Sequence, residues 1–272
     1  MHTSIRSYAM HCLTVLYIGG ATNLGKIEAV MQTKNDPGAK KISYDFLDRV
    51  IHDLRSPLSS ILNYIDLLSD PEVREDTRFI EECYPIVVRQ GKQINRLLDN
   101  ALITAAIDAG CFDFKMAPFS IGYLIEEIVE EMTDQTGREI LYKNQAGEII
   151  CVGDALRLRE MIINLIDNGI RFSSPEKPVG VSFRRSQAEG WAEISVQDQG
   201  TGFSEAEKEI LFNRFGRIRN NNFYGMQGSG LGLYIAAYIV ACHNGRIDVE
   251  SKAGEGSVFT VSLPIDVSGE GL

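Results

Sequence analysis

Four groups of residues in this chain have types and spacings suited to chemistry on phosphate, and the first surrounds a histidine. His52 is followed by Asp53, and Ser56 lies four residues further along a predicted helix, on the same outward stripe. A neighbouring carboxylate can hold one imidazole N–H and make the other ring nitrogen a better nucleophile. Arg55 offers a charge for phosphate. The pattern predicts a nucleophilic imidazole, against the simpler alternative of a solvated surface histidine.

Pro57 lies inside the same helical run. An interior proline costs about 3 kcal/mol and frees backbone groups in the preceding turn, here near His52. We therefore interpret Pro57 as part of the site, because packing alone does not account for it.

The second group is an amphipathic helix with a polar stripe. Asn164, Asn168 and Arg171 recur at i, i+4 and i+7, while apolar residues line the opposite face. An asparagine can offer a hard oxygen to Mg²⁺, and an arginine can meet a phosphate. The alternative is an exposed polar helix face with no ligand.

Two glycine-rich turns complete the set. Asp198, Gly200 and Gly202 directly follow an alternating strand at 191–197, where a carboxylate acceptor and close backbone approach suit a flat ligand. The second turn opens a predicted helix at 231–243, where free N–H groups receive phosphate oxygens. Its glycines do not complete a dinucleotide fingerprint, and no βαβ unit surrounds them, which disfavours a Rossmann fold. Its residues are Gly228, Gly230, Leu231 and Gly232.

A heptad pattern predicts the element that carries His52. Apolar residues spaced 4-3-4-3-4-3 form one seam, which Asp70-Pro71 interrupts, and a second helical run follows over residues 75–108. A single helical hairpin cannot bury both sides of its seam, so we expect two copies to form a four-helix bundle, with an intramolecular bundle as the alternative. The seam consists of Leu47, Ile51, Leu54, Leu58, Ile61, Ile65 and Leu68, and the second run has Val87, Ile94 and Ala101 at heptad spacing.

Beyond residue 112 helical and strand patterns alternate, which predicts a two-layer α/β domain with helices on one sheet. Helices are expected at 121–132, 155–172, 205–212 and 231–243, and strands at 191–197, 245–250 and 256–263.

Bulk properties limit the function. The net charge of −10 argues against nucleic acid as a partner. Five scattered cysteines without a C-x-x-C pair suit a reducing compartment with neither disulfides nor a zinc site. The apolar stretch at 10–21 is too short for a spanning helix, and a buried strand or helix is favoured over a secretory signal.

Taken in order, the segments resemble the two-component sensor histidine kinases over residues 42–264. Residues 52–58 resemble the H box, 164–171 the N box, 198–202 the first glycine box and 228–233 the second, while LFNRFGR, with Phe212 and Phe215, resembles the F box. Five motifs in family order make the resemblance specific.

The resemblance implies a role for each motif. His52 would be the phosphoacceptor and Asp53 its orienting base. Asn164 would ligate Mg²⁺, and Asp198 would hydrogen-bond the adenine of ATP. Gly200 and Gly202 would shape the adenine pocket, Asn168, Arg171 and the second glycine box would handle the phosphates, and Phe212 and Phe215 would belong to the nucleotide site.

We therefore expect the chain to be a cytoplasmic, ATP-dependent protein-histidine autokinase. It would pass the phosphoryl group to an aspartate of a response-regulator receiver domain. The expected fold is an α-helical-hairpin dimerisation domain (42–110) followed by an α/β two-layer sandwich ATP-binding domain (111–266), with a 1–41 segment of unknown role, a 267–272 tail, and membrane association left open. A non-catalytic nucleotide-sensing scaffold and an ATPase of the gyrase and chaperone type are the alternatives.

Three positions depart from the family pattern. Arg171 stands where lysine is common, and Gly169 stands where alanine is common. Ser56 occupies the position where Thr or Asn supports dephosphorylation of the partner, and its hydroxyl can still position a water.

Overall fold

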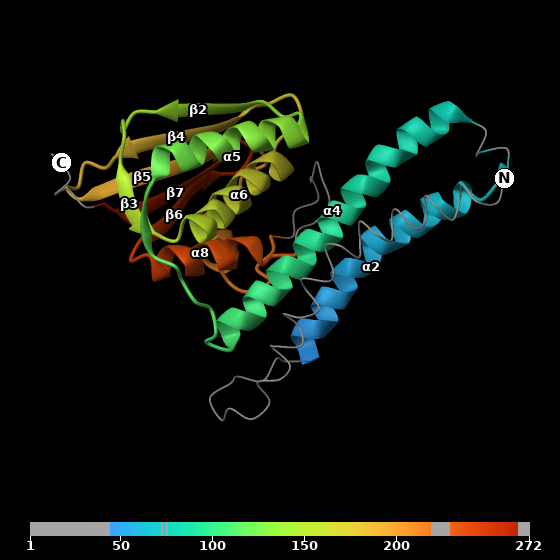
Figure 1. Cartoon of the computed structure of the whole chain (residues 1–272), viewed down its shortest axis with the longest axis horizontal. Helices are drawn as coiled ribbons and strands as arrows, with labels where there is room; N and C mark the ends of the chain where they lie inside the picture. Colours follow the sequence, from blue (N-terminus) through green and yellow to red (C-terminus); the bar gives the residue numbers. More distant parts are fainter. Residues whose placement is uncertain (1–43, 72, 74–75, 219–228, 266–272) are drawn as a thin grey trace. The chain divides into compact units, whose positions relative to one another are not determined.

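The computed structural model describes residues 44–71, 73, 76–218 and 229–265, which belong to two compact units (Figure 1). One unit ends at Phe112 and the other begins at Asp113. The predicted N-terminal segment, with its apolar stretch at 10–21, and the predicted tail lie outside the described residues. None of the helices within the described ranges has the length and apolar character needed to cross a membrane.

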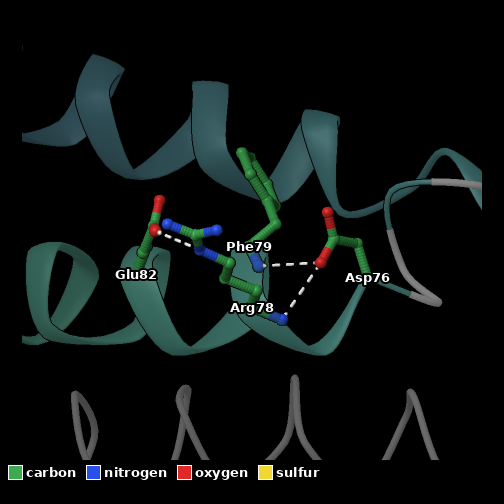
Figure 2. A network of polar contacts seen from close by, with 4 residues as sticks. All are labelled: Asp76, Arg78, Phe79 and Glu82. Carbon is green, nitrogen blue, oxygen red and sulfur yellow. Dashed lines mark hydrogen bonds and ion pairs between the residues drawn. The ribbon is translucent and has the colours of Figure 1, made fainter.

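The first unit is a hairpin of two long helices. Helices α2 (Tyr44–Leu67) and α4 (Thr77–Asp108) lie side by side and antiparallel. Figure 2 shows how α4 begins: a carboxylate oxygen of Asp76 accepts hydrogen bonds from the backbone N–H groups of Arg78 (3.0 Å) and Phe79 (3.2 Å). One turn later Arg78 pairs with Glu82 at 3.3 Å. Such a cap satisfies donors that the first turn leaves unpaired, which fixes where the helix starts.

Helix α2 carries two adjacent apolar stripes where the sequence predicted one seam. The inner stripe is buried or half-buried within the unit. The outer stripe is exposed, and three large apolar side chains of α4 are exposed as well: Ile80, Tyr84 and Val88. The inner stripe consists of Phe46, Val50, Leu54, Pro57, Ile61, Tyr64 and Leu68, and the outer stripe of Leu47, Ile51, Leu58, Leu62 and Ile65.

Two sequence interpretations of this unit need correction. Pro57 is buried on the inner stripe, so packing does account for it, contrary to our expectation. On α4 the predicted line Val87, Ile94 and Ala101 is only half-buried. The buried heptad line runs four residues earlier, through polar as well as apolar side chains, at Cys83, Gln90, Leu97 and Thr104.

The second unit is built on a mixed five-stranded sheet of order β2-β4-β5-β7-β6. Only β2 and β4 pair in parallel; the other neighbours are antiparallel. A separate antiparallel pair joins β1 (Ala117–Ser120) to β3 (Ile150–Gly153). The five strands are β2 (Ile140–Asn144), β4 (Val179–Arg185), β5 (Trp191–Asp198), β6 (Arg246–Lys252) and β7 (Gly256–Pro264).

Helices cover one face of this sheet, as the patterning predicted. Helices α5 (Ile121–Thr136), α6 (Ala155–Phe172) and α8 (Gly232–Cys242) lie together on that face (Figure 1). The core between the layers alternates along each strand, as at Val179, Val181 and Phe183 of β4, all at most 1% exposed. The short α7 (Glu205–Leu211) begins with a capping box, in which the Glu207 carboxylate accepts from the Ser204 N–H at 2.8 Å.

A buried histidine ties the start of α6 to the end of α8. The backbone N–H of Asp154 donates to His243 Nε2 at 2.9 Å, and His243 Nδ1 lies 2.7 Å from the Ile239 carbonyl oxygen. These partners fix the neutral ring with its proton on Nδ1, because a carbonyl accepts and an amide N–H donates. Helices α6 and α8, which carry two of the predicted phosphate motifs, are therefore held in fixed relation.

Candidate functional site

The histidine of the first motif lies on the surface of α2. Its side chain is 80% exposed, and its Nδ1 lies 3.3 Å from Oδ1 of Asp53, whose side chain is only 13% exposed. A carboxylate accepts, so this contact favours the proton on Nδ1 and leaves Nε2 with a free lone pair. Ser56, one turn further on, is also exposed. The arrangement offers solvent an oriented imidazole nitrogen, the form a nucleophilic catalyst requires.

The asparagine stripe of α6 meets the second glycine motif. A Cβ placed on Gly232, the first residue of α8, would lie 3.3 Å from Oδ1 of Asn164. Asn164 is 8% exposed and its Nδ2 has no hydrogen-bond partner. A buried polar atom without a partner is costly unless a ligand completes it. The side chain thus lies beside a helix N-terminus, where backbone N–H groups favour phosphate.

This position suits a nucleotide-bound magnesium ion. Mg²⁺ keeps several waters and takes one or two protein oxygens together with phosphate oxygens. The amide oxygen Oδ1 of Asn164, which lies against the first residue of α8, has the chemistry of a single protein ligand, whereas the unpartnered Nδ2 is a donor that suits a phosphate oxygen.

The remaining residues of the stripe are less buried than Asn164, and one of them already has a partner within the protein. Asn168 and Arg171 are half-buried. Arg171 Nη2 pairs with Oδ2 of Asp167 on its own helix at 2.7 Å, so part of its charge is already compensated. Gly169 lies against the sheet: a Cβ there would meet Val179 Cγ1 at 3.0 Å and Asp198 Cβ at 3.6 Å. This contact explains why glycine replaces the alanine common in the family, because an added methyl would push α6 away from the strand that carries Asp198.

Asp198 ends β5 with a buried carboxylate. Its Oδ1 accepts from the Gly200 N–H at 2.8 Å, and Ser257 on β7 donates through both its N–H and its hydroxyl. Burial raises the pKa of Asp198 above the ordinary carboxyl value, and these hydrogen bonds only partly offset the rise. A buried carboxylate held in a fixed direction can read one hydrogen-bond donor of a ligand.

The two glycines after Asp198 are required by close backbone contacts. A Cβ on Gly200 would lie 2.3 Å from the Phe172 carbonyl oxygen, and one on Gly202 would lie 2.0 Å from the Lys252 carbonyl oxygen. Gly202 also has φ +56°, a left-handed conformation that glycine adopts without strain. Both positions hold the loop tightly against α6 and β6.

Residues 219–228 are not among the described residues, and Gly228 of the second glycine motif is one of them. The F-box phenylalanines precede this range, and the rest of the second glycine motif follows it. Phe212 caps the end of α7 and is half-buried, as is Phe215, which has φ +60°. A Cβ on Gly230 would lie 2.8 Å from the Phe215 carbonyl carbon. Leu231 is 1% exposed and caps α8.

Sequence reasoning missed Ser257 and its neighbour. Ser257 lies 3.0 Å from the hydroxyl of Ser251, which in turn donates to the Gly256 carbonyl at 2.9 Å. The hydroxyl of Ser257 orients Asp198 from the adjacent strand β7, and Ser251 of β6 lies behind it. The only available signal was the pair of serines in SKAGEGS, which equally suits a turn.

Family models match both units of the chain. The His Kinase A (phospho-acceptor) domain matches residues 44–110, and the histidine kinase-, DNA gyrase B- and HSP90-like ATPase matches residues 153–267. A phosphoacceptor hairpin followed by this ATPase fold defines the class of the histidine kinases.

Individual relatives agree with that class. The Sensor protein SrrB of Staphylococcus aureus is 28% identical over 243 residues, which cover 88% of this chain but 41% of the relative, so the chain spans about two-fifths of the length of the curated relatives it matches. The chain belongs to the two-component sensor histidine kinases.

Solved structures share the fold. The histidine kinase ThkA in complex with the response regulator protein TrrA has a TM-score of 0.58 at 21% identity, with 82% of this chain and 62% of that chain covered. Full-length ShkA in complex with AMPPNP has a TM-score of 0.57 at 22% identity, with 82% and 46% covered. At these identities the likeness concerns the fold alone.

Proposed function

We propose that the chain is an ATP-dependent autokinase that phosphorylates His52 and passes the phosphoryl group to an aspartate of a response-regulator receiver domain. The observation that carries the proposal is the exposed, Asp53-oriented imidazole on a chain whose second unit has the ATPase fold. The ShkA complex with an ATP analogue and the ThkA complex with a response regulator, both of the same fold, support the choice of nucleotide and partner.

In the proposed reaction, Nε2 of His52 attacks the γ-phosphorus of ATP. The bond from that phosphorus to the bridging oxygen breaks, and ADP leaves with the electron pair. Asp53 holds the Nδ1 proton and stabilises the charge that develops on the ring. A receiver carboxylate then takes the phosphoryl group from nitrogen.

In the second unit, Asp198 would hydrogen-bond the adenine amino group. The N–H groups at the start of α8, with Gly230, Leu231 and Gly232, would receive phosphate oxygens. Magnesium, held by Asn164, would neutralise phosphate charge in the transition state. Asn168 and Arg171 would contact the phosphates from the same face of α6.

We also propose that the chain is a homodimer, in a cytoplasmic location where ATP is available. The support is the outer stripe of α2 together with Ile80, Tyr84 and Val88 of α4, an exposed apolar surface that hairpin pairing would cover. The division into a hairpin at 42–110 and a nucleotide domain at 111–266 is part of the same proposal.

Ser56 carries a second activity in this proposal. Its exposed hydroxyl, one turn from His52, can position a water for dephosphorylation of the partner. Ser56→Ala would then leave autophosphorylation unchanged and slow the loss of label from a phosphorylated receiver.

Labelling with ATP that carries radioactive γ-phosphate tests the main proposal. Wild-type protein should acquire an acid-labile, alkali-stable label that is absent in His52→Gln and that moves to receiver domains with an intact acceptor aspartate. ATP binding without label would indicate a nucleotide-sensing scaffold. Steady ATP turnover without a phosphoprotein would indicate an ATPase of the gyrase and chaperone type.

A further inference from the structure

Arg138 binds the segment that follows the polar helix α6. Its Nη1 donates to the Ile170 carbonyl at 3.2 Å, and its Nη2 donates to the carbonyls of Ser174 at 2.8 Å and Lys177 at 3.0 Å. One guanidinium therefore joins the last turn of α6 to the turn at 174–177. Neither the motifs nor the proposed reaction assigns a role to this residue.

The end of α5 delivers Arg138 to this position. Gly137 has φ +64°, and its N–H donates to the Thr133 carbonyl oxygen at 2.9 Å. This hydrogen bond ends the helix, and the chain reverses there. The hydroxyl of Thr136 accepts from the Arg138 N–H at 3.2 Å, which fixes the backbone of the arginine as well. A helix leaves its last carbonyls unpaired and carries partial negative charge at its C-terminus, and a guanidinium satisfies both.

The segment that Arg138 holds forms the support of the first glycine motif. Ser173 is 1% exposed, pairs with Gly200 in an isolated antiparallel bridge, and accepts from the Gln199 N–H at 3.2 Å. Lys177 Nζ lies 3.5 Å from the Gln199 carbonyl oxygen. The Gly200 N–H in turn binds the Asp198 carboxylate. A continuous set of contacts therefore runs from Arg138 to the carboxylate of Asp198.

We propose that Arg138 is a positioning residue for adenine recognition: it holds residues 170–177 so that the loop of Asp198 and Gly200 presents its carboxylate in the binding direction. This inference rests on the proposed function, in which Asp198 reads the adenine. Arg138 itself does not touch the nucleotide in this account.

A control exists in Arg159, another arginine that links α6 to the region of α5. Arg159 of α6 also bridges to α5, through ion pairs with Glu131 and with Glu127 at 3.7 Å, but it does not contact residues 170–177. Arg138→Met and Arg159→Met remove the same charge, but the first removes hydrogen bonds to backbone carbonyls and the second removes ion pairs with carboxylates. Arg138→Lys keeps the charge but not the forked donor geometry.

Autophosphorylation kinetics of the full chain test the role. Arg138→Met removes the hydrogen bonds from the guanidinium to the carbonyls of residues 170–177. The KM for ATP should therefore rise about tenfold, while kcat should stay within about twofold of wild type. Arg138→Lys should give an intermediate KM, and Arg159→Met should match wild type. A merely structural role would reduce the active fraction, and so kcat, without moving KM. An equal KM in wild type and Arg138→Met would overturn the inference.

Amide hydrogen exchange without nucleotide separates this inference from the proposed function. The N–H groups of Gln199 and Gly200 should exchange about tenfold faster in Arg138→Met and at the wild-type rate in Arg159→Met. Unchanged exchange in Arg138→Met would refute the support role even if the chain proves to be an ATP-dependent kinase. Faster exchange in a chain that does not bind ATP would leave the support intact and remove adenine as its ligand, which overturns the proposal as stated.

Discussion

Asp198→Asn should weaken nucleotide binding but should not lower the stability of the fold near neutral pH. Burial raises the pKa of the Asp198 carboxyl in the folded protein above its unfolded value. A group shifted in this direction contributes stability below the unfolded pKa and loses that contribution as pH rises through the folded pKa. The ionised carboxylate therefore costs stability near neutral pH, and a neutral amide of the same shape does not.

The binding effect follows from the lost acceptor. A hydrogen bond to a charged group contributes about 1.5–3 kcal/mol, which corresponds to a roughly 10- to 150-fold weaker affinity for ATP. The amide would present Nδ2 where an acceptor is needed, so it cannot replace the bond. Calorimetric titration with a non-hydrolysable ATP analogue measures this loss.

Thermal unfolding without nucleotide measures the effect of the substitution on stability. Asp198→Asn should unfold at the wild-type temperature or above near neutral pH. Wild type should gain on the variant as pH is lowered toward the ordinary carboxyl range, because protonation removes the buried charge.

Asp154→Asn is the matched control, because Asp154 is buried to a similar degree, 6% exposed against 5%. Burial also raises its pKa, but N–H donors of Lys115 and Arg157 outweigh that effect, and the pKa of Asp154 lies below the ordinary value. Its contribution to stability is present above the unfolded pKa and is lost as pH falls through the folded one. Asp154→Asn should therefore destabilise the fold by about 1 kcal/mol near neutral pH.

Equal losses of stability in the two variants would show that the buried, ionised carboxylate of Asp198 does not lower the stability of the fold. Unchanged nucleotide affinity in Asp198→Asn would show that its carboxylate does not read the adenine.

Three further predictions concern the hairpin and the cysteines. Leu62→Lys on the outer stripe should convert the dimer to a monomer in light scattering, while Asn63→Lys, one residue along, should not; a dimer in both would place the interface elsewhere. Asp76→Ala should lower the hairpin's free energy of unfolding by about 1 kcal/mol in urea titration, because two N–H groups lose their cap, and an unchanged midpoint would contradict the capping role. A maleimide should label the exposed Cys111 before the buried Cys151, since burial raises the pKa of the Cys151 thiol; equal rates would argue against that burial.

Local signals predicted the elements that carry the motifs. Helix α6 begins and ends at the predicted residues because Asp154 caps its start, accepting from the Arg157 N–H at 3.1 Å, and because its apolar face is regular. Strand β4 was not assigned from the sequence, although Val179, Val181 and Phe183 alternate along it. Pro178 and the charged residues that follow obscured that short pattern.

The sequence predicted less about how surfaces are divided. A heptad seam records which residues avoid water, but not whether the same chain or another one covers them. The predicted seam on α2 accordingly combined residues of both stripes, Leu54 and Ile61 from the inner one with Ile51 and Leu58 from the outer one.

Contacts between distant segments left no local trace. Arg138 precedes its three carbonyl partners by 32 to 39 residues, and nothing in its neighbourhood marks it. His243 binds the start of α6 from 89 residues away. Residues of this kind set the geometry of a site whose motifs are otherwise evident in the sequence.

The division of α2 into two stripes separates two tasks during divergence of related kinases. Substitutions on the inner stripe would alter the hairpin itself, whereas substitutions on the outer stripe would alter the proposed contact between subunits. In the proposed dimer, a handful of outward side chains, such as Leu47, Ile51 and Ile65, would therefore decide which chains pair. Exchange of these side chains between paralogues should redirect which subunits assemble together.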